Sequence, residues 1–227
     1  MIRSARTIFR KDLTIERRST EITVSVLLFS ALAVVIFAIG FYVDETNAQI
    51  YGPGVIWVVL LFASTLALNR LFDTERENDC LGGLLLTPAD PRGLYLGKAV
   101  FHWLMTLGAA IVTVPAIFMF FDMFRLIGSD AALVLAASLV LGLSAFSLVG
   151  TLFAAMLLHT RLREVLLPIV VYPLVTPVLI AGVQITRELL SGAPVAEVMG
   201  WFYQLVAFDL FFLAGCLVLF PIMVRAR

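Results

Sequence analysis

The longest polar segment of this chain, residues 69–98, carries four carboxylates within seven residues, followed by a group of leucines. The side chains in question are Asp73, Glu75, Glu77, Asp79, Leu81, Leu84 and Leu85. Carboxylates form ion pairs with basic groups, and apolar side chains left on a polar loop indicate docking onto a partner. The alternative is that the leucines pack against the ends of neighbouring membrane helices. Asp73 is a candidate N-cap for a short helix that ends near Gly82.

Asp209 is the only carboxylate well inside a long apolar stretch. An acid at such a position costs roughly 2.5–3.5 kcal/mol on membrane-insertion scales and usually faces protein or a cavity. Ion-coupled carriers generally have more than one such group. We therefore expect Asp209 to satisfy a neighbouring hydroxyl or backbone group, with a mechanistic role as the alternative.

The two histidines, His102 and His159, are candidate ligands because imidazole nitrogens can bind a haem iron axially. The chain has no C-x-x-C-H motif for attaching haem, and its two cysteines are too few for a cysteine metal site. Histidines near helix ends more often form hydrogen bonds, which is the interpretation we favour. We expect no metal site and no tightly bound cofactor.

A phosphate-binding loop reads G-x-x-x-x-G-K-[ST]. The nearest fragment is Gly97-Lys98-Ala99, in which Arg92 stands at the first glycine and Ala99 replaces the magnesium-binding hydroxyl. We therefore expect no ATP hydrolysis by this chain and no catalytic residues.

These residues must be positioned by membrane helices. Of the 227 residues, 61% are apolar and only 14% charged, with a mean hydropathy of +1.03, which nearly excludes a soluble domain. A spanning helix needs about 20 apolar residues, and apolar runs without period-two alternation exclude a barrel. The sequence predicts a single all-α transmembrane domain, 1–227, with spans near 22–43, 51–69, 99–121, 131–158, 165–186 and 201–224.

Charge sets the expected orientation. Fourteen of the 16 Lys and Arg residues lie in the segments on one side of these spans, and the positive-inside rule places that side, with both termini, in the cytoplasm. Residues 1–21 interleave apolar and basic side chains at helical spacing, which predicts an N-terminal helix in the membrane interface. The equal numbers of basic and acidic residues give no indication of nucleic acid.

Several motifs resemble those of a known family. Glu75-Arg76-Glu77, the run Leu84-Leu85-Leu86-Thr87-Pro88 and Leu96-Gly97-Lys98 are similar to motifs of ABC-2-type exporter permeases. More narrowly, the chain resembles the haem exporter protein B (CcmB) family of cytochrome c maturation. That resemblance rests on Pro53-Gly54-Val55-Ile56-Trp57, the run Leu66-Ala67-Leu68-Asn69-Arg70-Leu71-Phe72, and His102-Trp103 after Lys98.

The resemblance implies a permease subunit in the bacterial inner membrane, driven by ATP through a separate ATP-binding subunit. Two copies of each subunit would assemble with small membrane proteins of the maturation complex and serve a periplasmic haem chaperone. Haem is then the expected substrate, whether it crosses this subunit or is released from a partner. The polar segment 69–98 would be a cytoplasmic coupling helix between the second and third spans.

Two other functions remain open from the sequence. One is a generic ABC-2-type exporter permease for a drug, lipid or polysaccharide, and the other is a non-transporting scaffold of the maturation complex. The near absence of charge inside the spans argues against an ion-coupled carrier.

Overall fold

A computed structural model describes residues 1–41, 45–77, 90–158 and 160–225, and these residues form helices and turns without a strand. Six helices are long and apolar enough to cross a membrane, which confirms the predicted all-α architecture. The elements are α1 (Ile2–Ser19), α2 (Glu21–Gly40), α3 (Glu45–Arg70), α4 (Asp73–Glu77), α6 (Pro91–Phe120), η1 (Met123–Arg125), α7 (Ser129–Met156), α8 (Arg163–Leu190) and α9 (Val195–Arg225).

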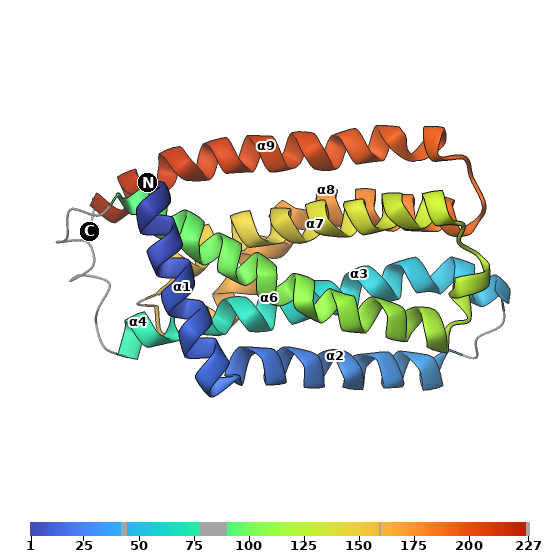
Figure 1. The fold of residues 1–227 in the computed structure, drawn as a ribbon, viewed down its shortest axis with the longest axis horizontal. Helices are drawn as coiled ribbons and strands as arrows, with labels where there is room; N and C mark the ends of the chain where they lie inside the picture. The colour runs from blue at the N-terminus through green and yellow to red at the C-terminus, as the bar shows by residue number, and fades with distance from the viewer. Residues whose placement is uncertain (42–44, 78–89, 159, 226–227) are drawn as a thin grey trace.

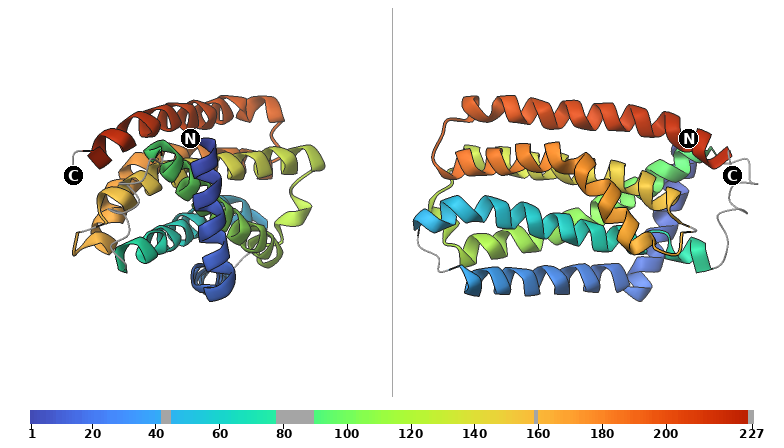
Figure 2. Two further views of the ribbon diagram at one scale, coloured as in Figure 1. Left: turned by 60° about the vertical axis from the view of Figure 1, so that its left-hand side comes forward. Right: turned by 180° about the vertical axis from the view of Figure 1, so that it is seen from behind.

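The six long helices lie side by side, with α2 and α9 at opposite edges of the bundle (Figure 1, Figure 2). Helix α3 is central, because 67% of its apolar stretch is buried, against 17% for α9. It packs against α2, α6, α7 and α8, whereas α9 contacts α6, α7 and α8. The start of α1 and the end of α9 lie at the same end of the bundle, which is the end that α1 crosses (Figure 1), as an even number of spans requires.

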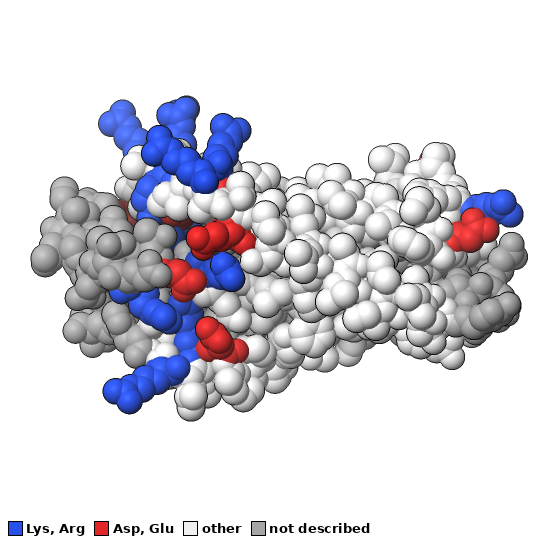
Figure 3. All heavy atoms as spheres, turned by 90° about the horizontal axis from the view of Figure 1, so that it is seen from below, with Lys and Arg blue, Asp and Glu red and all other residues white. Residues whose placement is uncertain are grey.

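We call the end of the bundle that carries α1 and α4 the charged end. On the face shown in Figure 3, most charged side chains gather there, a small group lies at the opposite end, and the surface between them is uncharged. An uncharged belt between two polar ends is the pattern expected of a multi-pass membrane protein.

Helix α6 begins well before the predicted span 99–121. Asp90 caps it by accepting a hydrogen bond from the Arg92 backbone N–H at 3.0 Å, and Pro91 occupies the first turn, where its missing N–H costs nothing. The added turns pack against α1. They are therefore shielded by protein, which a hydropathy pattern does not register.

Two glycines allow α1 and α6 to touch. A Cβ built on Gly93 would lie 2.6 Å from the carbonyl oxygen of Met1, and one on Gly97 would lie 2.7 Å from that of Ala5. Any larger residue at either position would push the two backbones apart. Gly93 and Gly97 are four residues apart and so share one face of α6, as in close helix pairs within membranes.

The corner between α1 and α2 is also closely fixed. Thr20 adopts a left-handed conformation with φ 54°, which turns the chain from α1, lying across the end of the bundle, into α2, lying along it (Figure 1). The buried Glu16 carboxylate then accepts hydrogen bonds from the Thr23 backbone N–H at 2.7 Å and the Thr23 hydroxyl at 2.7 Å. An anion at a helix N-terminus is favourable, so Glu16 stabilises the start of α2.

Trp57 is the centre of the core. Its indole ring lies where a Cβ on Gly142 or on Gly182 would come within 2.4 Å of it, so both glycines make room for the ring. The indole N–H donates to the Thr186 hydroxyl at 3.0 Å, which satisfies the only polar atom of a fully buried side chain. Trp57 thus joins α3 to α7 through its packing on Gly142 and to α8 through Gly182 and Thr186.

Candidate functional site: a buried charge cluster at the charged end

Four charged side chains meet beneath α1, and we call Lys11, Asp12, Glu75 and Lys98 the charge cluster. Glu75 on α4 is 2% exposed, Lys98 on α6 is 1% exposed and Asp12 on α1 is 6% exposed, whereas Lys11 is partly open to solvent. Two cations and two anions balance one another. Because burying a lone charge is costly, these groups tolerate burial only as a set.

Lys98 is the hub of the charge cluster. Its ammonium donates hydrogen bonds to Glu75 Oε2 at 2.7 Å and to the Leu71 carbonyl at 2.8 Å. It also forms an ion pair with Asp12 Oδ2 at 3.1 Å and lies 5.0 Å from the centre of the Phe72 ring. Lys98 thereby joins α6 to α1, to α4 and to the residues that follow α3.

Lys11 closes the charge cluster from the solvent side. It donates to Glu75 Oε1 and pairs with Asp12 Oδ1 at 3.0 Å. Burial alone would lower the pKa of Lys11, but the hydrogen bond to Glu75 and the charges of Asp12 and Glu75 raise it above its ordinary value. Burial alone would raise the pKa of Glu75, but Lys98 and Lys11 lower it. Lys11 and Glu75 are therefore both charged near neutral pH.

A second buried cation holds the other side of α4. Arg163, 2% exposed at the start of α8, donates from Nη2 to the Leu68 carbonyl at 3.0 Å and from Nη1 to Asp73 Oδ1 at 3.4 Å. Leu68 and Leu71 lie at the end of α3, where cations complement the helix dipole. The short α4 is thus tied to α1, α6 and α8, and the two cations also hold the end of α3.

The charge cluster links α4 mechanically to α1 and α6. Moving α4 alone would separate Glu75 from two lysines and leave buried charges unpaired, which costs several kcal/mol. Displacements of α4 are therefore shared with α1 and α6. Among the described residues, no group of three His, Cys, Asp or Glu side chains is placed to hold a metal ion.

The residues predicted to contact an ATPase divide into three groups. Asp73 is partly exposed and pairs with Arg163, whereas Glu75 is buried in the charge cluster and presents no free charge to a partner. Of Glu77 the structure describes only the backbone. The remaining candidates, Asp79, Leu81, Leu84 and Leu85, lie outside the described residues.

His102 is buried and uses both ring nitrogens. Nδ1 lies 2.8 Å from the Ser147 hydroxyl and Nε2 lies 3.0 Å from the Ser64 carbonyl. The carbonyl can only accept, so Nε2 carries the proton toward it. This geometry joins α3, α6 and α7 and supports the hydrogen-bonding interpretation. His159 lies outside the described residues.

Asp209 on α9 faces α7, where its Oδ2 accepts a hydrogen bond from the Ser144 hydroxyl. Its Oδ1 is buried without a hydrogen-bond partner among the described residues. The side chain borders a groove of about 240 Å³ between α6, α7 and α9. The contact with Ser144 is the neighbouring hydroxyl that the sequence led us to expect.

The sequence analysis identified Asp73 and Glu75 but missed the acid Asp12 and the cations Lys11 and Arg163, which pair with Glu75 and Asp73 respectively. The pairs join positions 64 to 90 residues apart, which no local pattern encodes. Lys98 was noted only within a motif. Its position beside an apolar run, eight residues after a helix-capping Asp90-Pro91, was the available signal.

Comparison with known proteins identifies the family of this chain. The family model of the CcmB protein matches residues 3–226. The chain is 30% identical over 212 residues to Heme exporter protein B of Pseudomonas aeruginosa, covering 92% of this chain and 89% of that protein. It is 33% identical over 141 residues to the protein of that name from Paracoccus denitrificans, covering 62% of this chain and 63% of that protein. For the Bradyrhizobium diazoefficiens protein of that name, the identity is 28% over 187 residues, or 82% of each chain. The chain belongs to the CcmB protein family.

Proposed function

We propose that this chain is the membrane permease subunit of a haem exporter that serves cytochrome c-type biogenesis. The observation that carries the proposal is the family match across residues 3–226, which takes in all six membrane helices. Haem is the substrate of the system. The chain contributes membrane helices and a docking surface, and it is not itself an enzyme.

A separate ATP-binding subunit drives the permease and docks beside α4, on the segment that contains Leu81, Leu84 and Leu85. The charge cluster supports this proposal, because α4 is rigidly linked to α1 and α6 and would pass a push from the docked subunit into the membrane helices. Asp73 and Glu77 supply rim charges. Glu75 holds α4 to α1 and α6 through the charge cluster and does not contact the ATP-binding subunit.

The charged end faces the cytoplasm of a bacterium, in its inner membrane, and the charge bias of the sequence supports this orientation. Two copies of the chain pair with two ATP-binding subunits. Small membrane proteins of the cytochrome c maturation complex and a periplasmic haem chaperone complete the system. Asp209 supports the packing of α9 on α7 and takes no part in transport.

Complementation tests the function. In a bacterium whose own gene for this subunit is deleted, the chain should restore covalent haem on c-type cytochromes, measured by haem staining of denaturing gels. Normal membrane levels of the chain without any haem-stained cytochrome would contradict the proposal.

Co-purification tests the docking site. Leu84→Asp should release the ATP-binding subunit, because apolar anchors carry more of an interface than rim charges do. Leu162→Asp is the matched control, since Leu162 is an exposed leucine in the turn before α8 at the same end of the bundle. Retention of the ATP-binding subunit by a normally inserted Leu84→Asp chain would place the docking surface elsewhere.

A further inference from the structure

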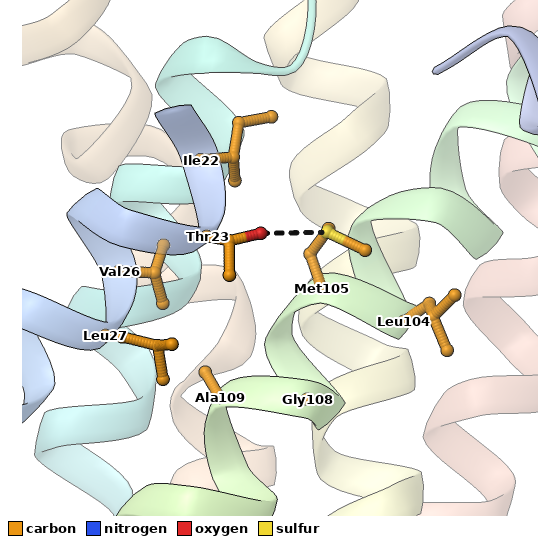
Figure 4. A pocket seen from close by; sticks show the side chains of 8 residues that line it. All are labelled: Ile22, Thr23, Val26, Leu27, Leu104, Met105, Gly108 and Ala109. Carbon is orange, nitrogen blue, oxygen red and sulfur yellow. Dashed lines mark hydrogen bonds between the residues drawn. The ribbon is translucent and has the colours of Figure 1, made fainter. Parts of the chain in front are cut away.

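A groove of about 160 Å³ opens between α2 and α6, near the corner where α1 meets α2. Its lining residues are Ile22, Thr23, Val26, Leu27, Leu104, Met105, Gly108 and Ala109 (Figure 4). All are apolar except Thr23, whose hydroxyl donates to Glu16 at 2.7 Å and lies 3.9 Å from the Met105 sulfur. The groove therefore offers an apolar ligand a surface with no unpaired polar group.

Small residues create the hollow. In Figure 4 the turn of α6 that carries Gly108 and Ala109 lies opposite Val26 and Leu27 of α2. A Cβ built on Gly108 would meet no atom within 4 Å, so the position is open. A bulky side chain at this position would start in open space and narrow the groove.

Two arginines precede this groove closely along the chain. Arg17 and Arg18 occupy the last turn of α1, only a few residues before Ile22, and both are exposed. The nearby acids are engaged elsewhere, because Glu16 caps α2 and Glu21 pairs with Arg70 at 3.5 Å. Within the described part of the chain, no acidic side chain pairs with either arginine. An apolar groove next to two uncompensated cations complements an amphiphile with an anionic head.

We propose that this groove binds an acyl chain of an anionic phospholipid whose phosphate pairs with Arg17 and Arg18. Arginine binds phosphate through paired N–H donors, and basic residues at a membrane surface attract anionic lipids. The bound lipid would hold the corner of α1 and α2, and through Lys11 and Asp12 it would steady the charge cluster.

Lipid exchange tests the site. The full-length chain, solubilised in detergent with any subunits that co-purify, is incubated with phosphatidylglycerol or phosphatidylcholine of identical acyl chains, and retained lipid is measured by mass spectrometry. We expect preferential retention of phosphatidylglycerol. The double variant Arg17→Gln/Arg18→Gln should lose about fivefold in affinity for each arginine removed, while its weaker retention of phosphatidylcholine stays unchanged. The matched control is Arg3→Gln/Arg6→Gln, which removes two exposed arginines from the other end of α1.

A substitution that fills the groove tests the acyl-chain site independently of the head-group site. Gly108→Leu should abolish retention of both lipids, whereas Gly215→Leu, at another open glycine of a membrane helix, should retain them. Equal retention by the two leucine variants would overturn the site. Equal losses in the two arginine pairs would show general attraction to the helix and also overturn it. If Gly108→Leu instead released a co-purifying subunit and kept the lipid, the groove would be a protein interface.

Discussion

Lys98 makes more contacts within the charge cluster than its other members, because its buried ammonium contacts the carboxylates of both Asp12 and Glu75 as well as the Leu71 carbonyl. Lys11 contacts the other oxygen of each of these two carboxylates from the solvent side and is partly exposed. The two lysines are therefore not equivalent. Loss of Lys98 leaves two buried acids with a single cation that water can screen.

We predict that Lys98→Met destabilises the folded protein by about 3–5 kcal/mol, the usual cost of removing one partner from a buried ion pair. Lys11→Met is the control and should cost less, since Lys11 is partly exposed. The measurement is the thermal unfolding of the purified chain in detergent. Combining Lys98→Met with Glu75→Met should cost less than the sum of the two single variants, because the double variant buries no unpaired charge from that pair. Additive costs would show that the two residues are not coupled.

The lowered pKa of Glu75 predicts that the stability of the folded protein falls at acid pH. Since its pKa in the folded protein lies below its ordinary value, its stabilising contribution is complete above about pH 4.3 and is lost as the pH falls through the lower folded-state value. We expect the wild-type chain to melt at a higher temperature than Glu75→Gln at pH 7, and the difference to shrink below about pH 4. Thermal unfolding across this pH range measures it. A constant difference would mean that Glu75 is not ionised in the folded protein.

At the scale of elements, apolar run length predicted the existence of the six spans, but not where α6 begins. A hydropathy pattern treats Arg92 and Lys98 as signs of a loop, whereas α1 shields these turns from lipid. The capping signal of Asp90-Pro91 and the paired glycines were present in the sequence. These signals could not place the start of α6 by themselves, because the helix extends that far only where α1 packs over it, and that contact depends on tertiary packing.

The contact between α1 and α6 gives a prediction with a matched control on the same helix. Gly97→Ala places a methyl group 2.7 Å from the Ala5 carbonyl oxygen, which should cost about 1–3 kcal/mol in thermal unfolding as the helices separate. Gly108→Ala adds the same methyl group in open space and should be neutral or stabilising by up to about 1 kcal/mol. Equal effects of the two changes would show that α1 does not approach α6 closely in the membrane.

At the scale of the whole molecule, some of the basic residues that predicted the orientation also take part in the ion pairs at the charged end. The basic residues that mark one side of the membrane include Lys11, Lys98 and Arg163, and the structure buries Lys98 and Arg163 in ion pairs. A count of basic residues could predict the side but not the pairing, because pairing depends on helices distant in sequence.

Membrane topology is the prediction that follows. In a chain carrying Cys80→Ser and Cys216→Ala, a new cysteine at Ser191 should react with an impermeant maleimide applied to cells whose outer membrane is permeable. One at Ser19 should react only after the inner membrane is opened. Both serines are exposed in the structure, at the opposite end of the bundle and at the charged end respectively, so access to reagent decides the labelling rather than packing. The physical reason is that translocating the many basic residues of the charged end is far less favourable than translocating an end with few. Labelling of Ser19→Cys in intact cells, with Ser191→Cys protected, would show that the predicted orientation is wrong. The proposed docking site for the ATP-binding subunit would then lie on the side of the membrane without ATP.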